Sequence, residues 1–335
     1  MLESIIFILE NNLYMKKLII SAMFLCAGFA ASAQQDAQFT QYMFNKLSVN
    51  PGSAGNNGGI CATLLHRAQW TGFEGAPVTT LFSGDVRLNK HGIGLTAFQD
   101  KLGIEKTFSA KLAYAYHINL GFGGAGELGI GLDVGMVNKS FGNDFIAIDD
   151  YTQDPSIPNA NTSATSYTLG FGLFYSVKNK MYVGISSLNI PQSEINDNSV
   201  PDGDTTGSAL SYLQSRHYYV MAGYDWDINN DKKWIVKPSL LAKTDASSTQ
   251  MDFTAVVLYN KLIWAGVTYR LDDAIAGLVG VYIPGVQGLK VGFSYDYTTS
   301  SLNNYSNGSL EFMVNYCTSI SKPPKREAYK SVRFL

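Results

Sequence analysis

The chain has 335 residues, with 25 Lys and Arg against 27 Asp and Glu, so its formal net charge is −2. Charged residues make up 16% of it and aromatic residues 13%, and there are 32 Gly and 20 Tyr. This balance gives no sign of the clustered basic surface that nucleic-acid binding needs, and the aromatic content excludes a disordered chain. Only one stretch, near the N-terminus, approaches the roughly 20 apolar residues of a membrane-spanning helix. The composition therefore leaves a large β protein, either soluble or embedded in an outer membrane.

Residues 1–33 have the pattern of a secretory signal peptide. Met15-Lys16-Lys17 supplies a basic start, an apolar run follows from Leu18 to Ala31, and small residues precede a cleavage point after Ala33. Residues 1–14 lie upstream of a natural start at Met15, as a gene-start extension or as a longer N-terminal region of the signal peptide. A transmembrane anchor is the alternative, but the run is short and ends in a cleavage pattern. We therefore expect an exported mature chain.

From Ile60 to Thr318, apolar residues alternate with small or polar ones. Along Glu127–Met136, for example, every second residue is apolar, and Gly, Asp or Glu stand between. This period of two predicts β-strands, because successive side chains point to opposite faces. The second face carries too few charges for the water-facing surface of a soluble sandwich or solenoid. We therefore predict an all-β fold, a transmembrane antiparallel up-and-down β-barrel with its apolar face toward outer-membrane lipid and its small, polar face toward the lumen.

The barrel is expected to span residues 60–318 with about 14 strands, an even number, as in outer-membrane barrels. The predicted strands are 60–69, 78–88, 91–99, 104–118, 126–138, 164–177, 180–190, 214–228, 233–244, 249–259, 261–271, 274–284, 288–299 and 308–318. An even number places both ends of the barrel on one side, which we expect to be the periplasm. Short connections such as Asn89-Lys90 then fall on the periplasmic side, and the longest, Lys139–Ser163 and Pro191–Leu213, fall on the outer side. This asymmetry is typical of outer-membrane barrels.

Charged residues of both signs are expected to face the lumen: Arg67, Arg87, Lys111, Glu127, Asp133, Arg270, Asp296 and Glu311. They would form either cross-lumen ion pairs or a path for a substrate.

Apart from the signal peptide, the chain has two cysteines, Cys61 and Cys317, near the periplasmic ends of the first and last strands. These strands must be neighbours in a closed barrel, and both cysteines fall on the lumen face. The two cysteines could form a disulfide across this seam or remain two inert thiols. The sequence leaves both alternatives open, because the stagger of a barrel can exceed the Cα–Cα distance that a disulfide spans.

No motif predicts a catalytic, cofactor-binding or metal site. The four histidines are scattered without ligand spacing, two cysteines cannot build a four-cysteine site, and the glycine-rich stretch 121–126 lacks the Gly-Lys-Ser/Thr of a phosphate loop. We predict that the protein is not an enzyme and has no cofactor.

The segments flanking the barrel do not look like generic barrel sequence. Residues 34–59 are rich in aromatics and precede the first strand, so they either dock into the lumen as a plug or bind a periplasmic partner. Residues 67–77, after the first strand, concentrate Trp, Gly and Pro. The tail, 319–335, is basic, and its Pro323-Pro324 ends the last strand and leaves an extended periplasmic peptide available to a partner.

These segments carry a family resemblance. Its residues are Gln38-Phe39-Thr40-Gln41-Tyr42, Asn45, Asn50-Pro51, Ala54-Gly55, Arg67, Gln69-Trp70, Gly72, Gly75, Pro77, Thr79 and Val332-Arg333-Phe334-Leu335. Over essentially its whole mature length the chain resembles the PorP/SprF outer-membrane proteins of the Bacteroidetes type IX secretion system. It departs from the family at Gly52-Ser53, where Ala and an aromatic are more usual, and at Lys46, commonly Pro. Both departures bear on how the N-terminal segment docks.

The resemblance implies a non-enzymatic outer-membrane component of type IX secretion. It would assist export or surface anchoring of a client such as an adhesin, with gliding motility among the possible tasks, and contact periplasmic ring or peptidoglycan-associated subunits. The family motif implies partner binding at Gln38, Phe39, Tyr42, Asn45, Asn50, Pro51, Arg67, Gln69, Trp70, Gly72, Gly75, Pro77, Arg333, Phe334 and Leu335. The alternative is an outer-membrane transport channel for small or apolar solutes, and a third possibility, an outer-membrane enzyme, lacks a visible catalytic group.

Overall fold

The computed structural model describes residues 37–120, 126–142, 162–196, 211–229, 231 and 233–319. The predicted signal peptide lies outside these residues. So does the tail beyond Ser319, with Arg333, Phe334 and Leu335, and so do large parts of the two longest predicted connections.

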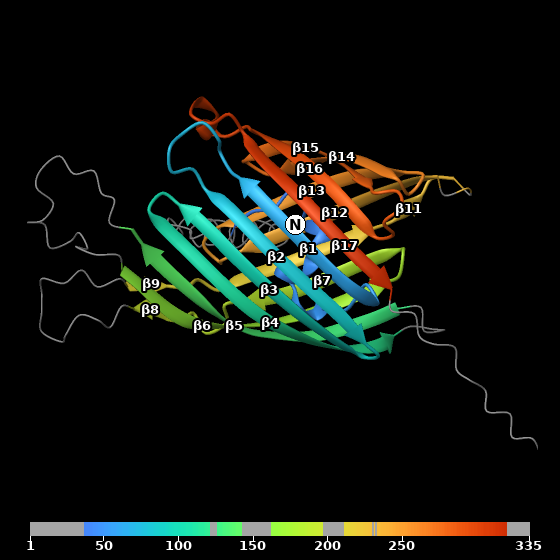
Figure 1. The fold of residues 1–335 in the computed structure, drawn as a ribbon, viewed down its shortest axis with the longest axis horizontal. Helices are drawn as coiled ribbons and strands as arrows, with labels where there is room; N and C mark the ends of the chain where they lie inside the picture. Colours follow the sequence, from blue (N-terminus) through green and yellow to red (C-terminus); the bar gives the residue numbers. More distant parts are fainter. Residues whose placement is uncertain are drawn as a thin grey trace, which may run out of the picture.

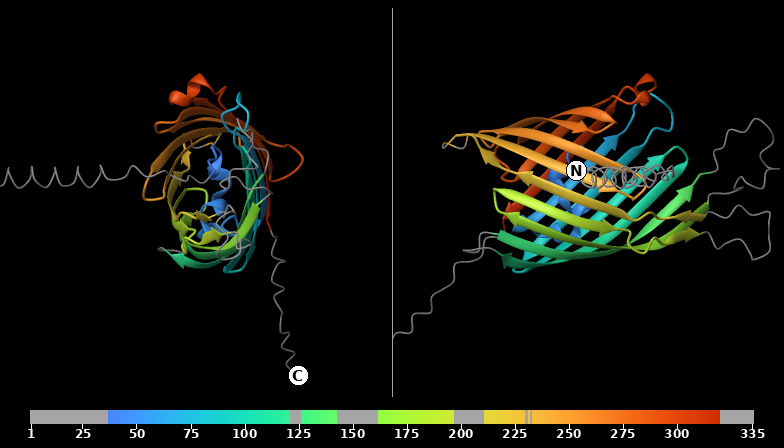
Figure 2. Two further views of the ribbon diagram at one scale, coloured as in Figure 1. Left: turned by 90° about the vertical axis from the view of Figure 1, so that its left-hand side faces the viewer. Right: turned by 180° about the vertical axis from the view of Figure 1, so that it is seen from behind.

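Fourteen antiparallel strands close into a barrel (Figures 1 and 2), as the sequence predicts. Consecutive strands pair with each other, and the pairing of β1 with β17 completes the closure. The strands are β1 (Gly59–Ala68), β2 (Val78–Leu88), β3 (His91–Leu102), β4 (Glu105–Leu120), β5 (Gly126–Phe141), β6 (Thr162–Val177), β7 (Met181–Leu188), β10 (His217–Tyr224), β12 (Trp234–Thr244), β13 (Thr249–Tyr259), β14 (Ile263–Arg270), β15 (Ala274–Tyr282), β16 (Leu289–Thr298) and β17 (Ser309–Ser319).

Three short strands add detail that the alternation pattern does not predict. The hairpin of β8 (Glu194–Asn196) and β9 (Ser211–Leu213) forms a sheet of its own within the connection from β7 to β10. The predicted strand 214–228 is interrupted at Asp225, whose N–H donates to the carbonyl of Lys180 at 2.7 Å. The chain then resumes as β11 (Trp226–Asp227), which pairs only with β12.

The outward face of the barrel is strongly apolar. Leu112, Leu132 and Val134 are 59%, 60% and 55% exposed, while the residues between such positions are largely buried. Surfaces of this extent are rare on soluble monomers and are normal where lipid covers a barrel. Among the described residues, no helix is long and apolar enough to cross a membrane.

The two ends of the barrel carry different connections. We call the loop end the one with the connections β1–β2, β7–β10 and β16–β17. We call the turn end the opposite one, where β2 joins β3 through Asn89-Lys90 and where β17 ends.

Residues 37–58, which we call the N-terminal segment, lie inside the barrel (Figure 2). They form three single turns of 3-10 helix, η1 (Tyr42–Phe44), η2 (Lys46–Ser48) and η3 (Pro51–Ser53). Because this segment occupies the middle of the lumen, many inward positions face protein rather than water.

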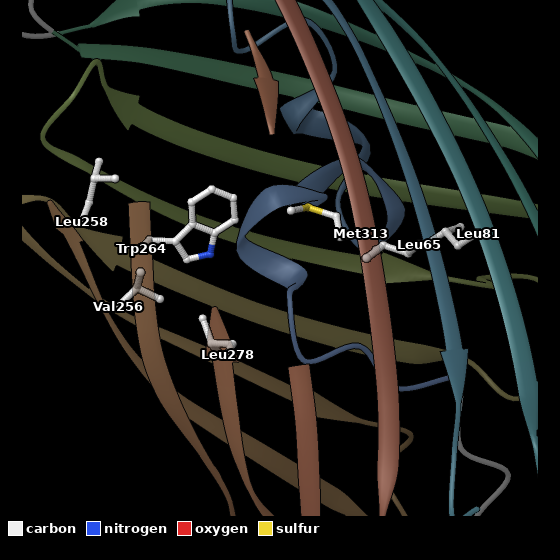
Figure 3. Packing of buried hydrophobic residues seen from close by; sticks show 7 residues of the cluster. All are labelled: Leu65, Leu81, Val256, Leu258, Trp264, Leu278 and Met313. Atoms are coloured by element: carbon white, nitrogen blue, oxygen red, sulfur yellow. The ribbon is translucent and has the colours of Figure 1, made fainter. Parts of the chain in front are cut away.

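The lumen face is therefore not uniformly small and polar, and that part of the expectation is wrong. Figure 3 shows an inward apolar cluster of Leu65, Leu81, Val256, Leu258, Trp264, Leu278 and Met313. Phe39, Met43 and Phe44 of the N-terminal segment pack against it, and the ring centroids of Phe44 and Trp264 are 5.1 Å apart.

Candidate functional site

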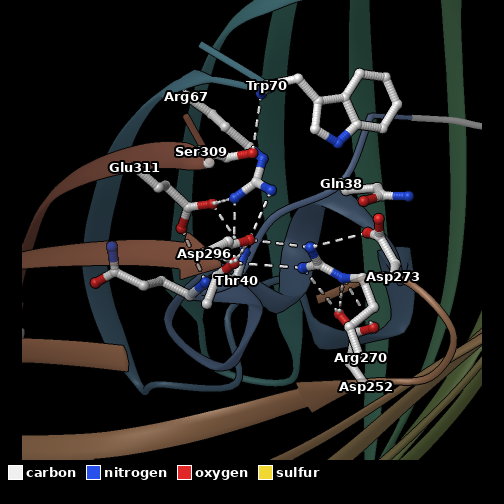
Figure 4. Close-up of polar contacts among 12 residues, drawn as sticks. Gln38, Thr40, Arg67, Trp70, Asp252, Arg270, Asp273, Asp296, Ser309 and Glu311 are labelled. Carbon is white, nitrogen blue, oxygen red and sulfur yellow. Dashed lines mark hydrogen bonds and ion pairs between the residues drawn. The ribbon is translucent and has the colours of Figure 1, made fainter. Parts of the chain in front are cut away.

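Five charged side chains form a buried network in the loop-end part of the lumen (Figure 4). Arg67 on β1 pairs with Asp296 on β16 at 2.7 Å and with Glu311 on β17 at 3.2 Å. Arg270 on β14 pairs with the same Asp296 oxygen at 3.0 Å and with Asp252 on β13 at 3.2 Å. Each of these residues is at most 3% exposed. A guanidinium satisfies two carboxylates at once because its donors are arranged in a fixed planar fork.

The N-terminal segment begins on this network. The backbone N–H groups of Thr40 and Gln41 donate to the two oxygens of Glu311, both at 2.8 Å. The Thr40 hydroxyl donates to Asp296 at 2.8 Å, and the amide of Gln38 donates to Gln250 on β13 at 2.7 Å. Each of its two oxygens holds one backbone N–H, so Glu311 is an attachment point for the chain.

The second half of the segment is attached through Asn50. Its side-chain amide donates to the carbonyls of Leu173 at 3.0 Å and Ile185 at 3.2 Å, on neighbouring strands β6 and β7. Its Oδ1 accepts from the N–H of Gly52 at 2.8 Å and so caps η3, which Pro51 opens. Proline is favoured at this first position because its fixed φ already suits the turn.

Small residues on the strands make room for this half. A Cβ on Gly131 of β5 would overlap the backbone of Pro51 and Gly52, and a Cβ on Gly92 of β3 would overlap the carbonyl of Ala54. His117 Nε2 lies 2.7 Å from that same carbonyl of Ala54. Gly92 and Gly131 therefore mark where the backbone of the N-terminal segment meets the backbone of the wall.

Two further side chains of the segment bind the wall between these attachments. The Tyr42 hydroxyl lies 3.0 Å from the Ser239 hydroxyl on β12. Burial raises the pKa of Tyr42, so the phenol stays protonated. Asn45 accepts from Ser83 on β2 at 2.7 Å. With these contacts, the segment reaches strands on both sides of the lumen.

The remaining motif residues shape the connection between β1 and β2. The N–H of Gln69 donates to Pro77 at 2.8 Å, and the N–H of Trp70 donates to Ser309 at 3.0 Å. Gly72 and Gly75 have φ of 118° and 80°, which an L side chain adopts only with strain. Thr71 exchanges hydrogen bonds with the connection between β16 and β17, at 2.8 Å to Gly308 and 2.6 Å from Asn307.

The motif thus separates into a lumen group and a loop group. Gln38, Phe39, Tyr42, Asn45, Asn50, Pro51 and Arg67 meet in the lumen, whereas Gln69, Trp70, Gly72, Gly75 and Pro77 build the β1–β2 connection. Arg333, Phe334 and Leu335 lie outside the described residues. Asp252 is not among the charges predicted to face the lumen. Its place between the apolar residues Met251 and Phe253 is a signal for it, and it stands opposite Arg270 in the strand register.

Cys61 and Cys317 face each other directly across the seam between β1 and β17. Their Cα atoms are 4.1 Å apart, and a disulfide joins them. They lie near the turn end, so the covalent link closes the barrel at the end opposite to the charge network.

The N-terminal segment separates two cavities. The loop-end cavity, of about 480 Å³, is lined among others by Phe39, Asp100, Lys111, Lys139 and Tyr219. In it, Lys139 pairs with Glu105 and lies over the ring of Tyr212.

The turn-end cavity, of about 190 Å³, is lined among others by Lys46, Asp85, Lys237, Trp264 and Lys290. Burial, together with repulsion from Lys237 and Lys290, lowers the pKa of Lys46 to about 8. Within the described ranges, no group of three or more His, Cys, Asp or Glu side chains is arranged to hold a metal ion.

A family model described as type IX secretion system membrane protein PorP/SprF matches residues 31–316. The chain belongs to this family. The resemblance seen in the sequence is thereby confirmed, and membership together with the closed barrel supports an outer-membrane location and a role in type IX secretion.

Several solved structures are similar to this PorP/SprF chain. The CymD monoaromatic hydrocarbon channel is 13% identical, with 88% of this chain and 97% of that chain covered and a TM-score of 0.45. The P. putida toluene transporter TodX is 9% identical, with 83% and 95% covered and a TM-score of 0.46. The Acinetobacter baumannii outer membrane protein Omp33 is 6% identical, with 78% and 98% covered and a TM-score of 0.41. No curated protein matches the chain.

Proposed function

We propose that this PorP/SprF protein is a closed, non-enzymatic outer-membrane scaffold of type IX secretion. It assists the export or surface anchoring of a client protein such as an adhesin, and it contacts the periplasmic machinery. Lipid covers its outward apolar face, its loop end faces the cell exterior, and its turn end, where β17 ends, faces the periplasm. The N-terminal segment starts in the loop-end part of the lumen, so a periplasmic N-terminus is not part of the proposal.

The observation that carries this proposal is the attachment of the N-terminal segment across the lumen. Glu311 on β17 holds Thr40 and Gln41, whereas the carbonyls of β6 and β7 hold Asn50 on the far wall. A channel for small or apolar solutes needs a continuous path, but here a bonded chain lies between the two cavities. The inward apolar cluster is also occupied, because Met43 and Phe44 pack against it.

Affinity purification tests the proposal directly. A tagged full-length protein, extracted from membranes of its own host after mild crosslinking, should copurify with a large exported protein or with periplasmic subunits, identified by mass spectrometry. In planar bilayers the same protein should show little conductance. High conductance of the unaltered protein, together with the absence of secretion partners, would support the solute channel instead.

A Thr40→Pro variant provides the control for the conductance measurement. Proline has neither the N–H that donates to Glu311 nor the hydroxyl that donates to Asp296, so the start of the segment loses both attachments and conductance should rise. That rise shows that the assay detects an open lumen when one exists.

A further inference from the structure

The turn-end cavity holds more positive charge than its carboxylates balance. Three lysines line it, Lys46 from η2, Lys237 from β12 and Lys290 from β16, against two carboxylates, Asp85 and Asp225. Both carboxylates are already engaged. Asp225 accepts from the Lys237 ammonium at 2.6 Å, and Asp85 accepts from the N–H of Gly55 at 2.7 Å. The lysines thus exceed the carboxylates by one positive charge, and among the described residues neither Lys46 nor Lys290 has a carboxylate within ion-pair distance.

Lys46 and Lys290 contact aromatic rings and a neutral amide instead. The ammonium of Lys46 lies 4.4 Å from the ring centre of Tyr182. That of Lys290 lies 5.3 Å from the ring centre of Tyr282 and donates to the amide oxygen of Asn315 at 3.2 Å. No carboxylate in the described part of the chain forms an ion pair with either group. Rings compensate a desolvated ammonium only in part, so an anion would be bound favourably here.

Neutral donors in the same wall also lack acceptors. Asn45 Nδ2, Trp264 Nε1 and the Tyr182 hydroxyl have no hydrogen-bond partner among the described residues, and Asn45 and Trp264 are 2% and 3% exposed. Buried donors are normally satisfied, and carbonyl oxygens are their usual partners. The wall therefore favours a ligand that carries both carboxylate and carbonyl oxygens and has an apolar part to lie against the rings. A free oxyanion would satisfy the lysines alone.

The loop-end cavity does not have this imbalance. Its Lys139 pairs with Glu105, and its acidic side chains include Asp100. The excess of donors is thus a property of one cavity and not of the lumen as a whole.

We propose that the turn-end cavity is a binding site for an acidic peptide segment. A carboxylate of the peptide pairs with Lys46 and Lys290, its carbonyls accept from the neutral donors, and an apolar side chain lies against Phe44 and Tyr282. The site goes beyond the proposed function, because binding to purified protein depends neither on a secretion partner nor on which side of the membrane the turn end faces.

Binding of a defined probe to the full-length protein in nanodiscs tests the site. The probe is the peptide acetyl-Asp-Phe-Asp-amide, and its comparison is acetyl-Asn-Phe-Asn-amide, which has the same shape without charge. We expect the acidic peptide to bind at least about tenfold more tightly, since a hydrogen bond to a charged group is stronger than a neutral one. Lys46→Gln and Lys290→Gln should each weaken binding by about tenfold, as loss of one such bond predicts.

Lys90→Gln is the matched control, because Lys90 is an exposed lysine at the same end of the barrel and does not line the cavity. It should leave the affinity within about twofold. Unchanged circular dichroism and electrophoretic mobility show that each variant is folded, and Lys290→Arg should keep binding.

Three outcomes would overturn the inference. They are equal binding of the charged and the neutral peptide, loss of binding in Lys90→Gln as large as in Lys290→Gln, and complete displacement of the peptide by inorganic phosphate at the peptide's own concentration. The last would indicate a site for free oxyanions. None of these outcomes bears on copurification with secretion partners, so the proposed function stands or fails separately.

Discussion

The loop-end network and the turn-end cavity differ in how the same kind of charge is used. At the loop end, Arg67 and Arg270 share Asp296, and each also pairs with a carboxylate of its own. At the turn end, Lys46 and Lys290 have rings and a neutral amide as neighbours. The comparison teaches that buried charge in this lumen has two uses. Where each cation is paired with carboxylates, the charges hold the chain's own N-terminal segment, and where the cations have no such partner, they remain available to another molecule.

Side-chain geometry explains why arginine and lysine are divided in this way. A guanidinium presents a rigid fork that fits two carboxylates at once, whereas an ammonium is a compact charge on a flexible stem that can follow a ligand. Burial of ion pairs brings little net stability, because desolvation offsets most of the attraction. The loop-end network therefore fixes where Thr40 and Gln41 dock more than it strengthens the barrel as such.

The largest effect is expected for Asp296→Ala. Removal of this carboxylate leaves two buried guanidiniums facing each other, and loss of one member of a buried pair costs about 3–5 kcal/mol. The free energy of unfolding, measured by denaturant titration of the refolded protein in lipid vesicles, should fall by that amount. Asp231→Ala is the control, because the Asp231 side chain is 48% exposed, and it should change little. Equal effects of the two variants would mean that the buried network contributes no more to stability than an exposed ion pair.

The next effect concerns the seam at the turn end. Cys61→Ser should lower the free energy of unfolding by about 2–4 kcal/mol, the usual contribution of a disulfide. The reason is that Cys61 and Cys317 are bonded across β1 and β17. Cys317→Ser should have the same effect, and the double variant should be no worse than either. Mass analysis of the non-reduced protein that found both thiols free, with near-neutral single variants, would show that the seam needs no covalent link.

Local periodicity predicts the barrel well, because consecutive residues of a strand alternate between its two faces. Gly, Ser and Thr alternate with exposed residues such as Leu132 and Val134, and no knowledge of distant contacts is required. The packing inside the lumen, by contrast, depends on contacts between residues that are far apart in the sequence. Trp264 and Leu258 face inward because Phe44, more than 200 positions earlier in the sequence, packs against them.

The two sites illustrate the same limit. Arg67, Arg270, Asp296 and Glu311 can be assigned to the lumen by parity, but their grouping depends on the register of several strands. Lys290 can be assigned to the lumen by the same parity as Asp296, but nothing in the sequence relates Lys237 and Lys290 to each other. Their significance comes from standing near Lys46 in a cavity whose shape only the folded chain defines.

A smaller effect on stability, with a larger one on permeability, is expected for Gly131→Ala. Its Cβ would overlap the backbone of Pro51 and Gly52, so the second half of the N-terminal segment must shift. Overpacking of this kind costs about 1–3 kcal/mol. Conductance in planar bilayers should rise, because the boundary between the two cavities is displaced. In Gly277→Ala the new Cβ would meet no atom within 4 Å, so this control should behave as the unaltered protein.

The smallest effect is expected for Tyr42→Phe, which tests whether the segment needs its neutral contacts as well as the charge network. The variant removes a hydroxyl that lies 3.0 Å from the Ser239 hydroxyl and leaves the packing of the ring unchanged. Since burial keeps the phenol protonated, the bond is a neutral one, and its loss should lower the free energy of unfolding by about 0.5–1.5 kcal/mol. Ser239→Ala should have a similar effect, and the double variant should cost less than the two single changes together, because both remove the same bond. Strict additivity would mean that Tyr42 and Ser239 are not coupled, and the middle of the segment would then be held by the packing of its side chains alone.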